Sequence, residues 1–352
     1  MKNEIVLIFN PLKNIVKRGI SIYSMELELL LKERNVDVVS LEMPNWFVGK
    51  SKLILFFGFL LWHQVILPIQ MLKYRPSVVI DAYNTYSILG AFLSKYIYII
   101  HDFIPFERER WWLRPNSVYQ RALHFLAPLF PRLYVYCIAP DIQEEAKIFI
   151  KVKTGILPNL VKKMMQNEVN VDVDLQRFCD VARANGEIFI TTISGSSSNK
   201  DFDGLLERLD VLRKNIALLS FGFPDCFEKK SKNGYVKVFS PGRRDAEQIG
   251  NMIARSDIFV FHSISEGFGR PIVEALMENK IVLASDVSPS LSFLSDKAKN
   301  NLIVYSLDED FSEAFYDALN KKPIAMEWRE VLIYNEDFIF NLERLYCAFE
   351  AY

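Results

Sequence analysis

Two glutamates flank a pair of glycines in the C-terminal half of the sequence. Seven residues separate Glu266 from Glu274, and Gly267 and Gly269 lie between them. A carboxylate accepts two hydrogen bonds from the vicinal hydroxyls of a sugar, whereas it repels a phosphate. Glycines expose backbone N–H groups, and a helix N-terminus carries partial positive charge, so the segment between the glutamates suits an anion. This spacing indicates a phosphate cradle with a sugar on each side, which describes a nucleotide sugar.

The elements around these residues position them at one edge of a sheet. The apolar run before Glu266 predicts a buried strand, and residues 264–270 predict a loop because they have no apolar period. Pro271 suits the start of a helix, and a second apolar strand follows that helix. This order is the repeating unit of a parallel α/β sheet, whose ligands bind beyond the carboxyl ends of the strands. We therefore expect Glu266, at the strand end, and Glu274, in the first turn of the helix, to face one crevice.

The stretch SEGFGRPIVEALMENKIVLASD, residues 265–286, resembles the double-glutamate signature of the family-4 glycosyltransferases. The resemblance covers most of the chain and is strongest from Ile188 to Val304. It implies the GT-B fold, an α/β architecture with two Rossmann-like domains that face a central cleft. It also implies transfer of a sugar with retention of the anomeric configuration.

The resemblance further implies roles for individual residues of this stretch. Glu274 is implied to hold the ribose diol. Glu266 is implied to hold the hydroxyls of the donor sugar, together with the backbone of Gly267, Phe268 and Gly269.

A loop of small residues, SGSSSNK at 194–200, follows the predicted strand Glu187–Ile193 and opens a helix. Its backbone donors and the charge of Lys200 make a reasonable diphosphate site. By the resemblance, Lys200 stabilises the leaving diphosphate, although a solvated lysine at a helix start is the alternative. Family members usually also present an arginine here, where this sequence has Gly195 or Ser196.

His101 follows the predicted strand Tyr96–Ile100 in the N-terminal half. A histidine at a strand end can bind or polarise a ligand, and a structural histidine is the alternative that the residues leave open. The resemblance implies that His101 faces the donor sugar. His101, Glu266 and Lys200 are therefore the catalytic candidates, and they would act by positioning and by stabilising the departing charge. The other histidines are expected in the core or at the surface, or have no assigned role: His63, His124 and His262.

Two further donor contacts are predicted from the resemblance. Gly19 opens a helix after the first predicted strand, Ile5–Phe9, where family members usually have a glycine pair that admits the phosphates. A helix-capping glycine is an equally good interpretation. Ser240 stands at the end of a later strand, in a predicted turn, near the place where the family reads the nucleotide base through the backbone.

The composition agrees with a two-domain enzyme. With 352 residues, half of them hydrophobic, the chain can bury two cores. The 42 basic and 43 acidic side chains leave no positive excess for nucleic acid. The four cysteines have no metal-ligand spacing and suggest a reducing compartment. We expect no metal or other cofactor, a cytoplasmic protein, an acceptor-side domain at 1–160, a nucleotide-sugar domain at 161–335, and a helix at 336–352 that crosses back to the first domain.

The apolar segment Leu53–Ile69 has two interpretations. It is short and polar for a spanning helix, since His63, Gln64 and Pro68 interrupt it. A buried helix of the N-terminal domain is one interpretation. A monotopic segment that contacts the cytoplasmic face of the inner membrane is the other, because a tryptophan and several cations flank it.

The functional hypothesis is a metal-independent, retaining hexosyltransferase. The donor is a nucleoside-diphosphate sugar, either GDP-mannose-like or UDP-linked, and the acceptor is a saccharide or a lipid-linked molecule. Family frequency favours bacterial surface polysaccharide, such as lipopolysaccharide or capsule. Two alternatives stay open: a nucleotide-sugar epimerase of the same fold, and a non-catalytic scaffold of a polysaccharide assembly complex, which the missing arginine favours.

Overall fold

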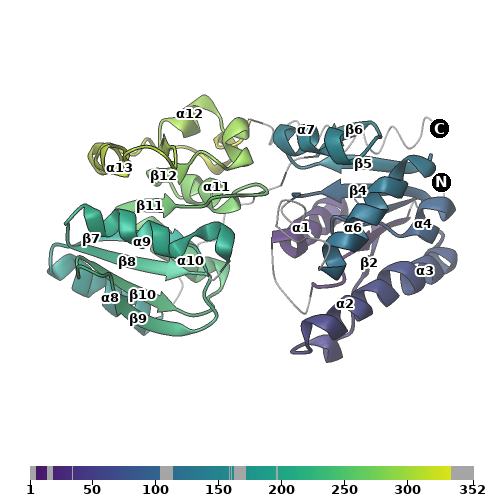
Figure 1. The fold of residues 1–352 in the computed structure, drawn as a ribbon, viewed down its shortest axis with the longest axis horizontal. Helices are drawn as coiled ribbons and strands as arrows, with labels where there is room; N and C mark the ends of the chain where they lie inside the picture. Colours follow the sequence, from purple (N-terminus) through teal and green to yellow (C-terminus); the bar gives the residue numbers. More distant parts are fainter. Residues whose placement is uncertain are drawn as a thin grey trace. The chain divides into compact units, whose positions relative to one another are not determined.

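The computed structural model describes residues 5–13, 19–33, 35–103, 114–157, 159, 161, 172–195 and 197–333. The chain divides into two compact units, Met1–Leu160 and Val161–Tyr352, and each unit is built on its own sheet (Figure 1). The predicted helix at 336–352 and Ser196 lie outside the described residues.

The N-terminal unit holds a sheet of six parallel strands in the order β2-β1-β3-β4-β5-β6. From β1 the chain moves to β2 at one edge and then returns through β3 towards the other edge, so the order reverses between β1 and β3. Strands β3 and β4 are buried almost throughout, as the unbroken apolar sequence of a parallel strand predicts. The strands are β1 (Ile5–Phe9), β2 (Asp37–Leu41), β3 (Val78–Asp81), β4 (Lys95–Ile100), β5 (Leu133–Cys137) and β6 (Thr154–Ile156).

Helices follow most of these strands. The first strand and the helix that opens at Gly19 are confirmed, and Tyr23, Leu27 and Leu30 of that helix are buried as their spacing predicts. Sequence patterns do not predict β2, because this edge strand is only half-buried and has no apolar run. The helical elements are α1 (Gly19–Glu33), η1 (Asn45–Phe47), α2 (Lys52–Leu61), η2 (Trp62–Ile66), α3 (Leu67–Tyr74), α4 (Ile88–Leu93), α6 (Pro115–Leu126), η4 (Ala127–Leu129) and α7 (Pro140–Phe149).

The apolar segment Leu53–Ile69 lies in one helical rod formed by α2, η2 and α3. The middle element, η2, is a π-helix, and Pro68 stands in the first turn of α3, where it breaks no hydrogen bond of that helix. His63, Leu67 and Met71 are buried against the unit, whereas the opposite side is exposed. The first interpretation, a buried helix of the N-terminal domain, therefore holds for only one side of the rod.

The C-terminal unit holds a sheet of seven strands in the order β13-β12-β11-β7-β8-β10-β9. All neighbouring pairs are parallel except β10 and β9. Sequence patterns do not predict β9, because this charged edge strand is mostly exposed. The strands are β7 (Ile188–Ile193), β8 (Ile216–Phe221), β9 (Cys226–Lys230), β10 (Val236–Pro241), β11 (Ile258–Phe261), β12 (Val282–Ser285) and β13 (Leu302–Tyr305).

Two apolar cores cover the two faces of this sheet. Alternate residues of β8 point to opposite faces, so Ile216 and Leu218 join the core under α9 and α13, whereas Ala217 and Leu219 join the core under α8 and α10. The helical elements are α8 (Val173–Ala184), η5 (Ser198–Lys200), α9 (Phe202–Val211), α10 (Ala246–Arg255), α11 (Arg270–Met277), η6 (Pro289–Phe293), α12 (Asp296–Lys299), α13 (Phe311–Asn320) and η7 (Trp328–Glu330).

One buried histidine makes the stability of the N-terminal unit depend on pH. His124 on α6 is 3% exposed and lies against the hydroxyl of Tyr98. Burial, with a smaller contribution from Arg121, lowers the pKa of His124 from 6.5 to about 4. The unfolded chain therefore binds a proton on this histidine that the folded chain rejects, and the stabilisation is lost as the pH falls from 6.5 towards 4.

We predict that the N-terminal unit loses about 2 kcal/mol of its free energy of unfolding between pH 7.5 and pH 5 through His124. The variant His124→Phe keeps an aromatic ring at this place and should show a smaller pH dependence, whatever its stability at pH 7.5. Hydrogen exchange of the β4 amides at the two pH values measures this difference. An equal loss in wild type and variant would show that another group takes up the proton.

Candidate functional site

The point where the strand order reverses lies between β7 and β11 in the C-terminal unit. These two strands are parallel neighbours, and the chain goes from β7 to β8 on one side of the sheet and from β11 to β12 on the other. Open α/β sheets bind their ligands at such a point, beyond the carboxyl ends of the strands. The loops that follow β7 and β11 carry Lys200 and Glu266.

The structure brings Lys200 and Glu266 into direct contact. The ammonium of Lys200 pairs with Glu266 Oε1 and lies 4.2 Å from the centroid of the Phe261 ring. Ser263 Oγ donates a second hydrogen bond to the same oxygen at 2.8 Å. The side chains of Lys200 and Glu266 are 15% and 11% exposed, so the pair is mostly buried and keeps only partial contact with solvent.

Asn199 ties the two loops together. Its Nδ2 donates to the carbonyl of Ser265 at 3.0 Å. Its own carbonyl accepts from the Ile264 N–H at 2.8 Å and lies 2.7 Å from Ser263 Oγ. The sequence analysis did not single out Asn199 or Ser263; their only signal is that each lies next to, or three residues from, a predicted site residue.

The helix α11 presents its N-terminus after this loop. Gly269 precedes it with φ +86°, a left-handed conformation that favours glycine, and a Cβ atom here would lie 2.8 Å from Ser288 Oγ. Glu274 is the fifth residue of α11, so its predicted place in the first turn is wrong: the helix begins at Arg270, one residue before the proline. Arg270 Nε lies 3.6 Å from Glu274 Oε1, which pairs the two side chains on one face of the helix.

The residues between the glutamates offer backbone rather than side-chain contacts. The Phe268 side chain is 4% exposed and packs against Phe293, with ring centroids 6.1 Å apart. Its carbonyl accepts from the Ser290 N–H at 2.8 Å. Gly267 is half-buried beside it. Phe268 therefore anchors the loop, and only its backbone is available for the predicted donor contact.

His262 has a structural position directly beside this cluster. Its Nδ1 lies 2.5 Å from the hydroxyl of Tyr305, and its Nε2 lies 3.3 Å from Asp201 Oδ2. Burial lowers the pKa of His262, and its hydrogen bond to the Asp201 carboxylate opposes that shift. Asp201 caps α9 through the Gly204 N–H and adjoins Lys200. His262 thus connects the end of β11 to the residue after Lys200, a link that the sequence does not reveal.

Three predicted residues lie outside this cluster. Ser240 is fully buried and belongs to β10 rather than to a turn, because β9 extends the ladder and pairs with it; its Oγ donates to the Asp225 carbonyl at 3.4 Å. Two strands, β7 and β8, separate β10 from β11. Gly19 and His101 are in the N-terminal unit.

Those two residues occupy different settings within their unit. Gly19 is exposed at the start of α1, and a Cβ atom there would meet nothing within 4 Å. His101 follows β4, is 5% exposed and contacts the Tyr23 ring edge-on at 5.0 Å. Its backbone N–H donates to Asn84 Oδ1 at 2.6 Å. His63 and His124 are buried, which confirms a core position for both.

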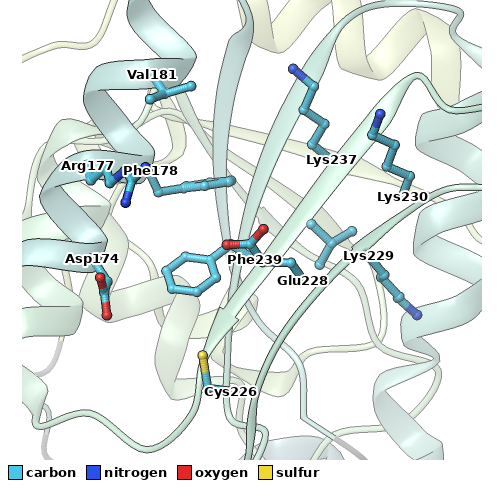
Figure 2. Close-up of a pocket in the computed structure, with 11 residues that line it drawn as sticks. Asp174, Arg177, Phe178, Val181, Cys226, Glu228, Lys229, Lys230, Lys237 and Phe239 are labelled. Carbon is cyan, nitrogen blue, oxygen red and sulfur yellow. The ribbon is translucent and has the colours of Figure 1, made fainter.

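A groove of about 670 Å³ lies elsewhere in the C-terminal unit, between α8 and the β9–β10 hairpin (Figure 2). Figure 2 shows Phe178 and Phe239 at its centre, with Arg177 from α8 and Lys230 and Lys237 from the hairpin around them. None of the predicted site residues lines this groove. Basic and acidic side chains are mixed on it, so its charge does not single out a ligand.

Over the part of the chain that the structure describes, no three His, Cys, Asp or Glu side chains are grouped so that they could hold a metal ion.

One protein-family model matches most of the C-terminal unit. Residues 178–335 match the model of the family "Glycosyl transferases group 1". This segment contains β7, β11 and α11 with Lys200, Glu266 and Glu274. No curated protein matches this sequence. The C-terminal unit is therefore similar to the group 1 glycosyltransferases, in line with the resemblance at this coarser level, while membership of family 4 and retention of configuration stay predictions.

Solved structures resemble the whole chain. A sucrose-phosphate synthase from Thermosynechococcus elongatus is 14% identical, with 99% of each chain covered and a TM-score of 0.70. HepE from Anabaena, in a complex with UDP-glucose, is 15% identical over 97% of this chain and 99% of that chain, with a TM-score of 0.61. WaaG, a glycosyltransferase involved in lipopolysaccharide biosynthesis, is 15% identical over 96% and 95%, with a TM-score of 0.61. These likenesses establish the predicted fold class: the chain has the α/β GT-B fold, with two Rossmann-like domains.

We predict that Gly269→Ala lowers the free energy of unfolding of the C-terminal unit by about 2–4 kcal/mol, from left-handed strain and from overlap with Ser288. Gly186→Ala is the matched control, because Gly186 has φ +64° but open space around it. It should cost only the strain, about 1–2 kcal/mol. Urea unfolding of the two variants measures the difference, and equal losses would contradict the close contact. The double variant Gly269→Ala with Ser288→Gly should regain the part of the unfolding free energy that is lost to the overlap, but not the part that is lost to strain.

Proposed function

We propose that this protein is a retaining glycosyltransferase that moves a sugar from a nucleoside-diphosphate sugar to a saccharide or lipid-linked acceptor. The observation that carries the proposal is the Lys200–Glu266 pair at the reversal point of the C-terminal sheet, inside the segment that matches the glycosyltransferase family. An acidic group beside a cation and a helix N-terminus suits a ligand with both hydroxyls and phosphates. HepE and its UDP-glucose support the donor class by likeness of fold.

The contact between Lys200 and Glu266 suggests how the donor enters. In the structure the carboxylate balances the ammonium, so neither charge is left unpaired in a mostly buried place. A diphosphate is the stronger partner for Lys200, and it also meets the N-terminus of α11. Glu266 then becomes available to accept hydrogen bonds from the sugar hydroxyls. Donor binding thus replaces the Lys200–Glu266 ion pair by a contact of Lys200 with the diphosphate and a contact of Glu266 with the sugar.

Other residues complete the proposed site. Glu274 is proposed to hold the ribose diol, and its pairing with Arg270 restrains the carboxylate on the surface of α11. Arg270 adds positive charge near the helix N-terminus, which suits a diphosphate. In the N-terminal domain, His101 is proposed to approach the donor sugar and Gly19 to admit the phosphates. No metal or other cofactor is required by this scheme.

The acceptor and the pathway are proposed from a likeness of fold. WaaG acts in lipopolysaccharide biosynthesis, and its likeness of fold supports a role in bacterial surface polysaccharide. The proposed location is the cytoplasm, where nucleotide sugars are made. UDP-linked and GDP-mannose-like donors are both compatible with the site.

We predict that Lys200→Ala weakens binding of the nucleoside diphosphate about 10- to 100-fold, the loss expected for one charge-assisted hydrogen bond. Lys232→Ala, at an exposed lysine of the β9–β10 turn, is the matched control and should bind like wild type. Isothermal titration with UDP and GDP measures the dissociation constants. Unchanged affinity in Lys200→Ala would rule out its contact with the diphosphate.

We predict that Glu266→Gln impairs sugar transfer and leaves nucleotide binding intact. Binding of the free nucleoside diphosphate should stay equal or tighten, because Lys200 loses its competing carboxylate. Sugar transfer should fall about 100-fold, because a preorganised contact to the donor sugar is lost. Titration and a turnover assay with the accepted donor measure the two effects. Loss of nucleotide binding together with turnover would indicate a folding defect instead.

A donor panel with anomeric analysis tests the reaction itself. We predict that the product keeps the anomeric configuration of the donor, which the anomeric proton coupling in NMR reports. Free nucleotide with an epimerised sugar in the absence of acceptor would favour the epimerase. Absence of turnover with every nucleotide sugar and acceptor tested would favour the scaffold.

A further inference from the structure

The rod formed by α2, η2 and α3 is unusually apolar for a helix with an exposed side. Among the described residues, Leu53–Tyr74 is the one helix that is long and apolar enough to cross a membrane by length and composition. It has 22 residues and a mean hydropathy of 1.8, yet only 22% of its most apolar window is buried. A core helix of a soluble domain would be mostly buried. This rod therefore needs another explanation.

Its exposed apolar residues form one stripe. From Phe57 the stripe continues every four residues through Leu61, Val65 and Ile69, and each of these side chains is 46–60% exposed. In an α-helix a four-residue step drifts by about 40° around the axis. The wider turn of the π-helix η2, in the middle of the run, counteracts this drift and keeps the side chains on one side. Further members of the stripe are Leu53, Ile54 and Leu72.

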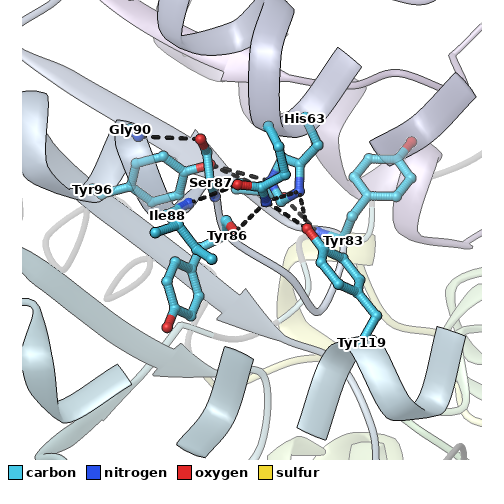
Figure 3. Close-up of polar contacts among 10 residues, drawn as sticks. His63, Tyr83, Tyr86, Ser87, Ile88, Gly90, Tyr96 and Tyr119 are labelled. Carbon is cyan, nitrogen blue, oxygen red and sulfur yellow. Dashed lines mark hydrogen bonds and ion pairs between the residues drawn. The ribbon is translucent and has the colours of Figure 1, made fainter. Parts of the chain in front are cut away.

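The opposite side of the rod is locked to the sheet by a buried polar network (Figure 3). His63 Nε2 lies 2.6 Å from Asp81 Oδ2 at the end of β3, and both side chains are fully buried. Tyr96 donates to the same carboxylate oxygen at 2.9 Å, and the hydroxyl of Tyr119 lies 3.0 Å from His63 Nδ1. Gln64 accepts from the Ile88 N–H, which joins the rod to α4. Lifting the rod off the domain would leave these buried polar side chains without their hydrogen-bond partners, which disfavours a position in which the rod spans a bilayer.

The charges around the stripe are of one sign. No acidic residue occurs from Met43 to Ile80. Lys50 precedes the rod, Lys52 is its first residue, Lys73 lies in its last turn and Arg75 follows it. Lys50, Lys73 and Arg75 are exposed. Trp46, just before the rod, is 60% exposed, and α4 beside α3 adds exposed Leu89 and Phe92.

We propose that this stripe docks the N-terminal domain on an anionic lipid bilayer, with the rod lying in the plane of the membrane surface. Apolar side chains enter the acyl boundary, while the cations at both ends meet lipid phosphates and the tryptophan sits at headgroup level. A second copy of the chain is a poorer occupant, because it would bring the same cations against each other. The inference does not depend on the proposed reaction, although a membrane position would give the site access to a lipid-linked acceptor.

Flotation of the full-length chain with vesicles tests the proposal. Wild type should bind vesicles that contain phosphatidylglycerol and bind phosphatidylcholine vesicles at least tenfold more weakly. Phe57→Ser with Leu61→Ser and Leu72→Ser should weaken binding at least tenfold, because these exposed side chains contribute little to the fold. The matched control, Val173→Ser with Val211→Ser, changes side chains that are 79% and 70% exposed in the other unit and should bind like wild type. Lys50→Gln with Lys73→Gln should reduce the preference for anionic lipid and its sensitivity to salt.

Three outcomes would overturn the proposal. Equal vesicle binding by wild type and the triple variant, with both folded by circular dichroism, would place the contact elsewhere. Retention in the membrane after carbonate extraction would indicate a spanning segment. Absence of vesicle binding together with a dimer that the triple variant dissociates, measured by light scattering, would make the stripe an interface between copies.

Discussion

The candidate site depends on the parallel pairing of β7 with β11. This pairing sets two loop starts side by side, and Asn199 then ties them through the backbone of Ile264 and Ser265. Because these hydrogen bonds hold the loops in register, the ammonium of Lys200 can meet the carboxylate of Glu266. An ion pair between long side chains on unconnected loops would contribute little, since ordering them would offset the attraction. The backbone contacts therefore hold Lys200 and Glu266 in one arrangement.

The N-terminal unit uses buried polar groups in a related way. At the reversal between β1 and β3, the Asn10 amide accepts from the Tyr83 hydroxyl at 2.5 Å and donates to the Ser21 carbonyl at 3.3 Å. Nearby, Asp81 and His63 join β3 to the apolar rod. Satisfied buried networks specify one arrangement of the elements because every alternative leaves a polar group without a partner. Both domains therefore secure the loops and helices around their sheets by polar side chains in an apolar setting.

Much of the fold follows from local pattern. The strands of unbroken apolar sequence and the helix at Gly19 are confirmed, because side-chain period and propensity are properties of neighbouring residues. The edge strands β2 and β9 are not predicted, because β2 is half-exposed and β9 is charged. Their extended conformation depends on pairing with a neighbouring strand. Pairing with β9 also places Ser240 in β10, where the sequence predicts a turn. Because α11 begins at Arg270, Glu274 lies beyond the first turn in which it was predicted. The roles of Gly19 and His101 stay predictions, because they depend on a donor that would meet both domains.

The sequence by itself determined the chemistry available at the site: two glutamates, a glycine turn and a lysine at strand ends, together with an apolar helix flanked by cations. These are consequences of residue type and short-range spacing. Only the tertiary structure decided which of these groups touch. Lys200 and Glu266 are 66 residues apart, and their contact arises from the strand order of the sheet. Packing likewise decided which side of the apolar rod is exposed. Hydrophobicity favours burial but does not specify which surface covers an apolar side chain. Here the buried His63–Asp81 pair sets the face of the rod that packs on the domain.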